Sequence, residues 1–144
     1  MAKVVAINIS EKKGVIKKSI DKGFFKVEHG LEGDAHAGKW HRQVSLLGQE
    51  SIDKMIAKGI NDLTPGKFAE NITTEGIELY ELPIGTKLRI GETEMEVTQI
   101  GKECHHGCEI RKLTGDCVMP REGIFTRVLK EGVIKAGDEI KIIK

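Results

Sequence analysis

Residues 86–100, TKLRIGETEMEVTQI, contain the pattern that decides the fold class. From residue 93 onward, apolar Met95 and Val97, with Gln99 as a further candidate, alternate with glutamates and threonines. A period of two is typical of a strand with one buried face and one wet face. Gly91 and Glu92 separate this run from the preceding TKLRIG, so we expect the two runs to form a β-hairpin.

Short runs rich in β-branched and apolar residues recur along the rest of the chain and are predicted to be strands. They lie at residues 3–10, 23–30, 42–48, 70–79 and 137–144. Glycine and proline residues separate them, as they commonly do between strands.

Two segments have helical spacing instead. In residues 48–60, Ile52, Met55 and Ile56 stand at i, i+3 and i+4, and Gly59 follows where a helix would end. In residues 121–132, the apolar side chains would also fall on one helical face: Ile124, Val128 and Leu129. We therefore expect a helix in each segment.

The chain holds 17 glycines among its 144 residues, a length that supports one hydrophobic core. Many short strands and few helices favour a mainly β fold, a β-barrel with a few short helices, because closure removes exposed strand edges. An open α+β sheet is the alternative. We expect a single domain over residues 1–144.

Composition excludes several classes of protein. Charged residues make up 31% and hydrophobic residues 39% of the chain, as in a soluble globular protein. A net charge of +1 gives no general attraction to nucleic acid, and no stretch is apolar for long enough to cross a membrane. The N-terminus lacks the pattern of a signal peptide, so a cytoplasmic location is expected. There, an odd count of three cysteines favours thiols or metal ligands over disulfides.

Residues 101–110, GKECHHGCEI, place two cysteines and two histidines within five positions. A zinc site could draw its ligands from Cys104, His105, His106, Cys108 and the later Cys117, although the spacing does not form the usual two close pairs. Cys108 and Cys117 could equally be small buried residues. Cys104 is the best candidate for a reactive thiol, because it follows a predicted strand end and has Lys102 and His105 nearby.

A second constellation occupies residues 30–47, GLEGDAHAGKWHRQVSLL. Its glycines allow a ligand to approach the backbone, and its cationic side chains are charge-assisted donors to a phosphate or carboxylate. An anion site is one interpretation, and a solvated loop is the other. No nucleotide-binding pattern is present, and the glycines disfavour the helix on which two histidines would bind a metal. The candidates are Asp34, His36, Lys39, His41 and Arg42.

A third stretch, TPGKFAENITTEGIEL at residues 64–79, carries polar side chains that could line a pocket. They could also belong to a turn and an exposed strand face. The candidates are Lys67, Glu70, Asn71 and Thr73.

Taken together, these segments resemble the MOSC domain, named after the C-terminal domain of molybdenum cofactor sulfurase. The resemblance rests on GLEGDAHAG followed by HRQVSLL, then PGKFAENITTEGIEL, LPIGTKLRIGE and EVTQIGKECH, in that order. It extends from about Val4 to Ile142. The sequence Cys-His-His-Gly-Cys and the tail GDCVMPREGIFTRVL depart from many relatives and resemble a short, stand-alone, clostridial-type member.

The resemblance implies a β-barrel that binds the molybdenum cofactor, molybdopterin, whose pterin dithiolene ends in a phosphate. It places the pterin and phosphate region at residues 33–42 and matches a family stretch to Phe68, Glu70, Asn71, Ile72 and Thr73. Counting along EVTQIGKEC puts the family cysteine at Cys104, which would carry a persulfide or bind molybdenum. The cofactor-binding set expected from motifs and resemblance is Asp34, His36, Lys39, His41, Arg42, Lys67, Asn71 and Thr73.

The same resemblance implies which proteins would supply and accept sulfur. The chain has no room for the pyridoxal-phosphate desulfurase domain of the larger sulfurases, so no pyridoxal phosphate is expected. A cysteine desulfurase or another protein would supply sulfur, and a molybdoenzyme or cofactor-synthesis protein would accept it. Two alternatives stay open: a molybdenum-dependent reductase of N-hydroxylated compounds with Cys104 as the metal ligand, and a zinc-stabilised binding module.

Overall fold

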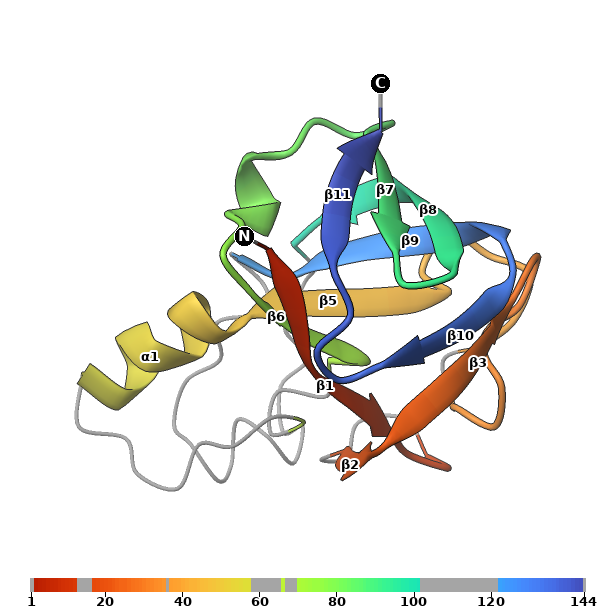
Figure 1. The fold of residues 1–144 in the computed structure, drawn as a ribbon, viewed down its shortest axis with the longest axis horizontal. Coiled ribbons are helices and arrows are strands. Elements are labelled where there is room, and N and C mark those ends of the chain that lie inside the picture. The colour runs from red at the N-terminus through yellow and green to blue at the C-terminus, as the bar shows by residue number, and fades with distance from the viewer. Residues whose placement is uncertain are drawn as a thin grey trace.

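The computed structural model of the chain describes residues 2–12, 17–35, 37–57, 66, 70–101 and 122–143 (Figure 1). Strands are the main secondary structure of these residues, with one α-helix and one short 3-10 helix. In chain order the elements are β1 (Lys3–Ile9), β2 (Lys18–Ile20), β3 (Lys22–Lys26), β4 (Gly30–Leu31), β5 (Val44–Gly48), α1 (Gln49–Ala57), β6 (Ile72–Glu75), η1 (Leu79–Glu81), β7 (Lys87–Ile90), β8 (Thr93–Ile100), β9 (Ile124–Lys130), β10 (Gly132–Lys135) and β11 (Ile140–Ile143). Each run expected to be a strand contains one.

The larger sheet has eight strands in the order β11-β7-β8-β9-β5-β6-β1-β2. The expected hairpin is confirmed, since β7 and β8 pair antiparallel and Ile90 lies opposite Thr93 across the turn. Met95 and Val97 are fully buried, as the period of two predicts. Strands β5 and β6 pair in parallel, and α1 lies in the connection between them.

The expected closed barrel is not found among the described residues. Strands β11 and β2 stand at opposite edges of the eight-stranded sheet. The chain just before β11 does approach β1: the Val4 N–H donates to the Asp138 carbonyl at 2.8 Å, and an isolated bridge joins Lys3 to Glu139. Two more backbone hydrogen bonds join the same segments, from the Ile140 N–H to the Ala2 carbonyl at 3.0 Å and from the Gly137 N–H to the Val4 carbonyl at 2.7 Å. The described residues here form one isolated bridge rather than a ladder, and β11 pairs with β7.

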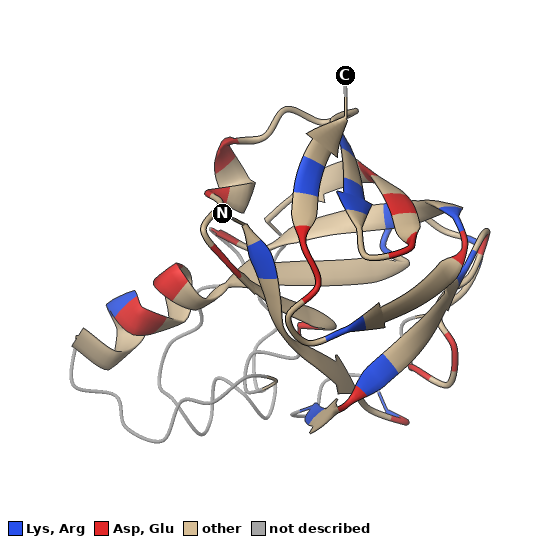
Figure 2. Ribbon diagram, viewed as in Figure 1, with Lys and Arg blue, Asp and Glu red and all other residues tan. Residues whose placement is uncertain are grey.

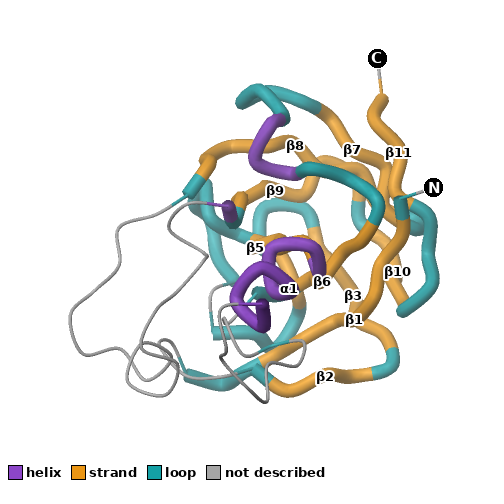
Figure 3. Tube along the Cα trace, turned by 90° about the vertical axis from the view of Figure 1, so that its left-hand side faces the viewer, coloured by secondary structure: helices purple, strands orange, loops and turns teal. Residues whose placement is uncertain are grey.

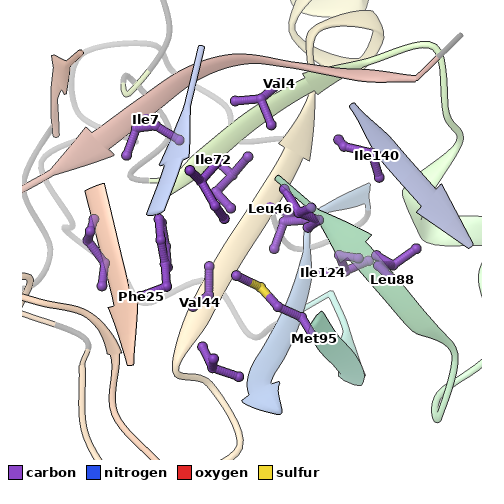
Figure 4. Packing of buried hydrophobic residues seen from close by; sticks show 14 of the residues in the cluster. Val4, Ile7, Phe25, Val44, Leu46, Ile72, Leu88, Met95, Ile124 and Ile140 are labelled. Carbon is purple, nitrogen blue, oxygen red and sulfur yellow. The ribbon is translucent and has the colours of Figure 1, made fainter. Parts of the chain in front are cut away.

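A second sheet of three strands, in the order β10-β3-β4, packs against the first. The core lies between the inner faces of the two sheets, where Phe25 of β3 meets apolar side chains from β1, β5, β6, β8 and β9 (Figure 4). Among the residues that the structure describes, sixteen buried ones form one continuous cluster. At about 25 cal/mol for each Å² of apolar surface removed from water, this burial is the main stabilising contribution.

The helix predicted in residues 48–60 is confirmed as α1, which buries Ser51, Ile52 and Met55. Figure 3 shows α1 at the end of the sheet formed by β5 and β6. The prediction of a helix in residues 121–132 is wrong, because residues 124–130 form strand β9 between β8 and β5. The β-branched residues Ile124, Thr126 and Val128 also fit a period of two, and the two neighbouring strands favour that alternative.

Among the described residues, no helix has both the length and the apolar composition that crossing a bilayer requires.

Candidate functional site

The glycine-rich segment at residues 30–42 folds back on itself between β4 and β5. Gly30 has a φ of +109°, and a Cβ there would lie 2.5 Å from the Gln43 carbonyl oxygen, so glycine is required. The Gly38 N–H donates to the His29 carbonyl at 2.6 Å, and the Ala35 N–H donates to the Ser10 carbonyl at 2.8 Å. These bonds hold the segment against the end of β1.

Asp34 lies at the base of this segment, inside the protein. Its Oδ1 accepts from Lys17 Nζ at 2.7 Å, and both side chains are 0% exposed. The same oxygen accepts from the Ser10 N–H at 3.0 Å, while Lys17 Nζ also donates to Ser10 Oγ at 3.0 Å. The structure thus gives the Asp34 carboxylate a buried partner that anchors the segment.

His41 and Arg42 lie next to the end of β8. Arg42 Nε donates to Gln99 Oε1 at 3.1 Å, and His41 Nε2 is 2.9 Å from the same oxygen. An amide oxygen only accepts, so this contact requires a proton on His41 Nε2. Gln99 Nε2 donates to the Gly101 carbonyl at 2.7 Å, which fixes the amide in this orientation. Thr98 Oγ1 also donates to the His41 carbonyl.

Aromatic rings support the Arg42 guanidinium. Its Cζ is 5.2 Å from the ring centre of Phe125 and 6.0 Å from that of Trp40. Phe125 lies on β9, directly opposite Gln99 in the strand register. Arg42 therefore reaches over β9 to β8 in a fixed position, with cation–π contacts that stabilise its charge.

A cavity of about 470 Å³ opens beside this group. Lys39, Trp40 and His41 line one side of it, and Thr98 lines another. An ion pair between Glu96 and Arg127, with 2.7 Å between Oε1 and Nε, belongs to the same lining. The cavity thus combines an ammonium, an imidazole and an exposed indole.

Asn71 and Thr73 are fully buried and do not line this cavity. Asn71 Oδ1 accepts from the Ser45 N–H at 3.0 Å, and Thr73 Oγ1 donates to Glu70 Oε2 at 2.6 Å. Asn8 Nδ2 donates to Thr73 Oγ1 at 3.0 Å and so joins β1 to β6. In the described structure these side chains link β1, β5 and β6.

Several candidates lie outside the described residues. They are His36, Lys67, Cys104, His105, His106, Cys108 and Cys117. Gly101 is the last described residue before the segment that holds the three cysteines, and Gln99 stands five positions before Cys104 in the chain. In the part of the chain that the structure describes, no group of three or more His, Cys, Asp or Glu side chains could hold a metal ion.

Sequence reasoning missed the role of Gln99, which it considered only for the buried face of β8. The structure shows instead a half-buried side chain that joins two motifs. A polar residue that breaks an apolar alternation at a strand end was the available signal. Lys17 was missed too, and its sequence setting gives no indication of complete burial.

A model of the MOSC domain matches residues 33–141. YuaD from Bacillus subtilis is 21% identical, with a TM-score of 0.76 over 99% of this chain and 96% of that chain. YiiM from Geobacillus stearothermophilus is 20% identical, with a TM-score of 0.77 over 100% of this chain and 76% of that chain.

YiiM from Escherichia coli is 18% identical, with a TM-score of 0.70 over 100% of this chain and 70% of that chain. At these identities the likeness shows a shared fold. No curated protein gives a significant match to the chain.

Proposed function

Because this chain belongs to the MOSC domain family, we propose that it binds the molybdenum cofactor beside His41 and Arg42. The proposal includes sulfur handling at Cys104, the cysteine that the family resemblance assigns. The observation that carries the proposal is the shared contact of His41 and Arg42 with Gln99. It brings the cationic segment to the strand end from which the chain continues to Cys104.

The residues present fit a pterin that ends in a phosphate. Lys39 and His41 line the cavity, whereas Arg42 follows His41 in the chain and is not a lining residue. Arg42 uses only its Nε in the hydrogen bonds of the described residues, so its terminal nitrogens can donate to a phosphate beside the cavity. Trp40 is 37% exposed and lines the same cavity, where an indole can pack against a flat pterin ring. When bound, the cofactor supplies the redox and sulfur chemistry of molybdenum.

Positioning is the task of the residues around the cavity. Gln99 holds His41 and Arg42 together, and the Phe125 ring packs against the Arg42 guanidinium. A cationic group held in place before binding loses little side-chain entropy when the phosphate arrives. Arg42 and Lys39 would thus orient the phosphate, which leaves the opposite end of the cofactor for a thiolate.

Cys104 would act as the sulfur carrier. Its thiolate would attack the sulfane sulfur of a persulfide on a donor protein, and the donor cysteine would leave as a thiolate. Cys104 would then hold the persulfide for transfer to the cofactor. The sulfur donor would be a cysteine desulfurase, and a molybdoenzyme or a cofactor-synthesis protein would accept the product.

Binding and sulfur loading can be tested separately. Titration of apoprotein with released cofactor, followed by pterin fluorescence, should give binding about ten- to a hundredfold weaker for Arg42→Gln than for wild type, since one charge-assisted contact is worth about 1.5–3 kcal/mol. Lys130→Gln, an exposed change on β9, should bind like wild type. If Arg42→Gln and wild type bind the cofactor with equal affinity, Arg42 does not bind its phosphate.

Sulfur loading is measured by persulfide labelling after incubation with a cysteine desulfurase and cysteine. Wild type should be labelled, and Cys104→Ser should not. Cys108→Ser is the matched control and should retain the label. A Cys104→Ser protein that still accepts sulfane sulfur would show that another thiol is the carrier.

A further inference from the structure

Four cationic side chains surround a second cavity, of about 660 Å³, where the small sheet meets the edge of the large one. Lys22 comes from β3 and Lys135 from β10, while Arg89 comes from β7 and Lys141 from β11. All four are exposed, and β3, β10 and β11 carry Lys or Arg positions in Figure 2.

These cations stand in pairs of like charge. Lys22 is directly opposite Lys135 in the β3–β10 ladder, and Arg89 is directly opposite Lys141 in the β7–β11 ladder. Like charges directly opposite each other destabilise a sheet. Two such pairs, from two different sheets, face the same cavity.

Elsewhere the sheet places opposite charges in register. Lys3 is opposite Glu75 and forms an ion pair with it at 3.1 Å. Arg127 is opposite Glu96 and forms an ion pair at 2.7 Å. The two pairs of like charge therefore depart from the arrangement found on other described strands.

Three carboxylates also line the cavity, and only one of them forms an ion pair with a lining cation among the described residues. Glu92 Oε1 accepts from the Val133 N–H at 2.9 Å, and Asp138 Oδ2 accepts from the Lys135 N–H at 2.9 Å. Glu139 forms an ion pair with Lys141 at 3.1 Å.

In the part of the chain that the structure describes, Lys22, Arg89 and the Lys135 ammonium form no ion pair. Glu94, which is opposite Arg89 on β8, forms none either.

We propose that this cavity binds a small oligophosphate anion, with two or more linked phosphate groups. Such an anion can place one phosphate near Lys22 and Lys135 and another near Arg89, whose planar guanidinium donates two parallel hydrogen bonds. Its negative charge removes the repulsion within each pair. The lining contains no aromatic residue, so the cavity offers no ring on which a nucleotide base could stack.

This site is separate from the cofactor site proposed above. The second cavity adjoins the β7–β8 turn at Gly91, whereas His41 and Arg42 contact Gln99 near the other end of β8. From Thr93 to Gln99 the strand extends about 20 Å, at about 3.3 Å for each residue. A substitution in one site should therefore leave the other unchanged.

Calorimetric titration with sodium triphosphate at low ionic strength tests the proposal, because low salt preserves the attraction between exposed charges. Arg89→Gln and Lys135→Gln should each bind triphosphate about tenfold more weakly, since each loses a charge-assisted contact. Lys18→Gln, an exposed change on β2, should bind like wild type. Arg89→Gln should bind the molybdenum cofactor like wild type, which separates this site from the cofactor site.

Thermal unfolding gives an independent readout. In buffer without phosphate, Lys135→Glu should unfold at a higher temperature than wild type, because it places a carboxylate opposite Lys22. Triphosphate should raise the unfolding temperature of wild type and not that of Lys135→Glu. The proposal is overturned if triphosphate stabilises wild type no more than chloride of equal ionic strength does, or if Arg89→Gln and Lys135→Gln bind as wild type does.

Discussion

Gln99 Oε1 accepts a hydrogen bond from Arg42 Nε at 3.1 Å across 57 positions of the sequence. This bond joins the end of β8 to the cationic segment before β5, and Phe125 of β9 supports the arginine between them. Gln99, together with the Thr98 hydroxyl that donates to the His41 carbonyl, thus joins two motifs that the sequence keeps far apart.

Replacing Gln99 by leucine tests that relation. Gln99→Leu removes the common acceptor of His41 and Arg42, so the affinity for the molybdenum cofactor should fall about tenfold while the fold remains. The free energy of unfolding should change by about 1 kcal/mol or less, because the contacts are partly solvated. Fluorescence titration and urea unfolding measure the two quantities. A large loss of stability with unchanged affinity would assign Gln99 to the fold alone.

The buried Lys17–Asp34 ion pair should matter mainly for the stability of the fold. Lys17→Met leaves a buried carboxylate without its cation, so the protein should lose about 3–5 kcal/mol of unfolding free energy. The double variant Lys17→Met/Asp34→Leu should recover most of that loss, because it removes both charges. Urea unfolding of both proteins measures the difference. A double variant as unstable as the single one would show that the loss comes from packing rather than charge.

Much of the fold could be predicted from the sequence, because burial on one face leaves a period of two that is visible in runs such as Met95 and Val97. Strand β9 could not, since Ile124 and Val128 fit both periods and only the neighbouring strands decide between them. The open edge of the large sheet could not be predicted either, because strand patterns do not encode which strands pair with one another.

The candidate site was predictable in part for a similar reason. Cationic residues with glycines indicate an anion site, but composition does not show which cations share it. The complete burial of Asp34 with Lys17 and the position of Gln99 arise from contacts between distant segments. Such contacts leave no local pattern.

Gly30 and Gly137 have similar φ angles, so alanine substitutions at the two positions distinguish the cost of backbone strain from the cost of a steric clash. Gly30 has a φ of +109° and lies against Gln43, whereas Gly137 has a φ of +94° with open space where a Cβ would be. Gly137→Ala should cost about 1–2 kcal/mol from backbone strain alone. Gly30→Ala should cost a further 1–3 kcal/mol or so, because the methyl group meets the Gln43 carbonyl. Equal losses in urea unfolding would contradict this account of Gly30.

The pKa of Lys54 on α1 depends on its ion pair with Glu122, which lies just before β9. The Glu122 carboxylate, which is 3.0 Å from Lys54 Nζ, raises the pKa of this lysine above its ordinary value of 10.5, and the Tyr80 hydroxyl adds to the effect. The stabilisation from this pair is therefore complete below pH 10.5 and is lost as the pH rises through the folded-state pKa.

In Glu122→Gln, the pKa of Lys54 should fall toward its ordinary value. NMR titration of the Lys54 side chain measures the change, with Lys18, an exposed lysine on β2, as the internal reference. An unchanged Lys54 pKa in Glu122→Gln would assign the shift to Tyr80.

The most direct test of the central claim is the molybdenum and pterin content of the purified protein. The protein is expressed in a host with an active molybdenum-cofactor pathway and in the same host with that pathway deleted, and the metal is measured by elemental analysis and the pterin by fluorescence after oxidation. Our account predicts molybdenum and pterin near equal amounts in the first preparation, a reduced content in Arg42→Gln, and neither in the second. Zinc alone, at the same level with and without the pathway, would contradict cofactor binding.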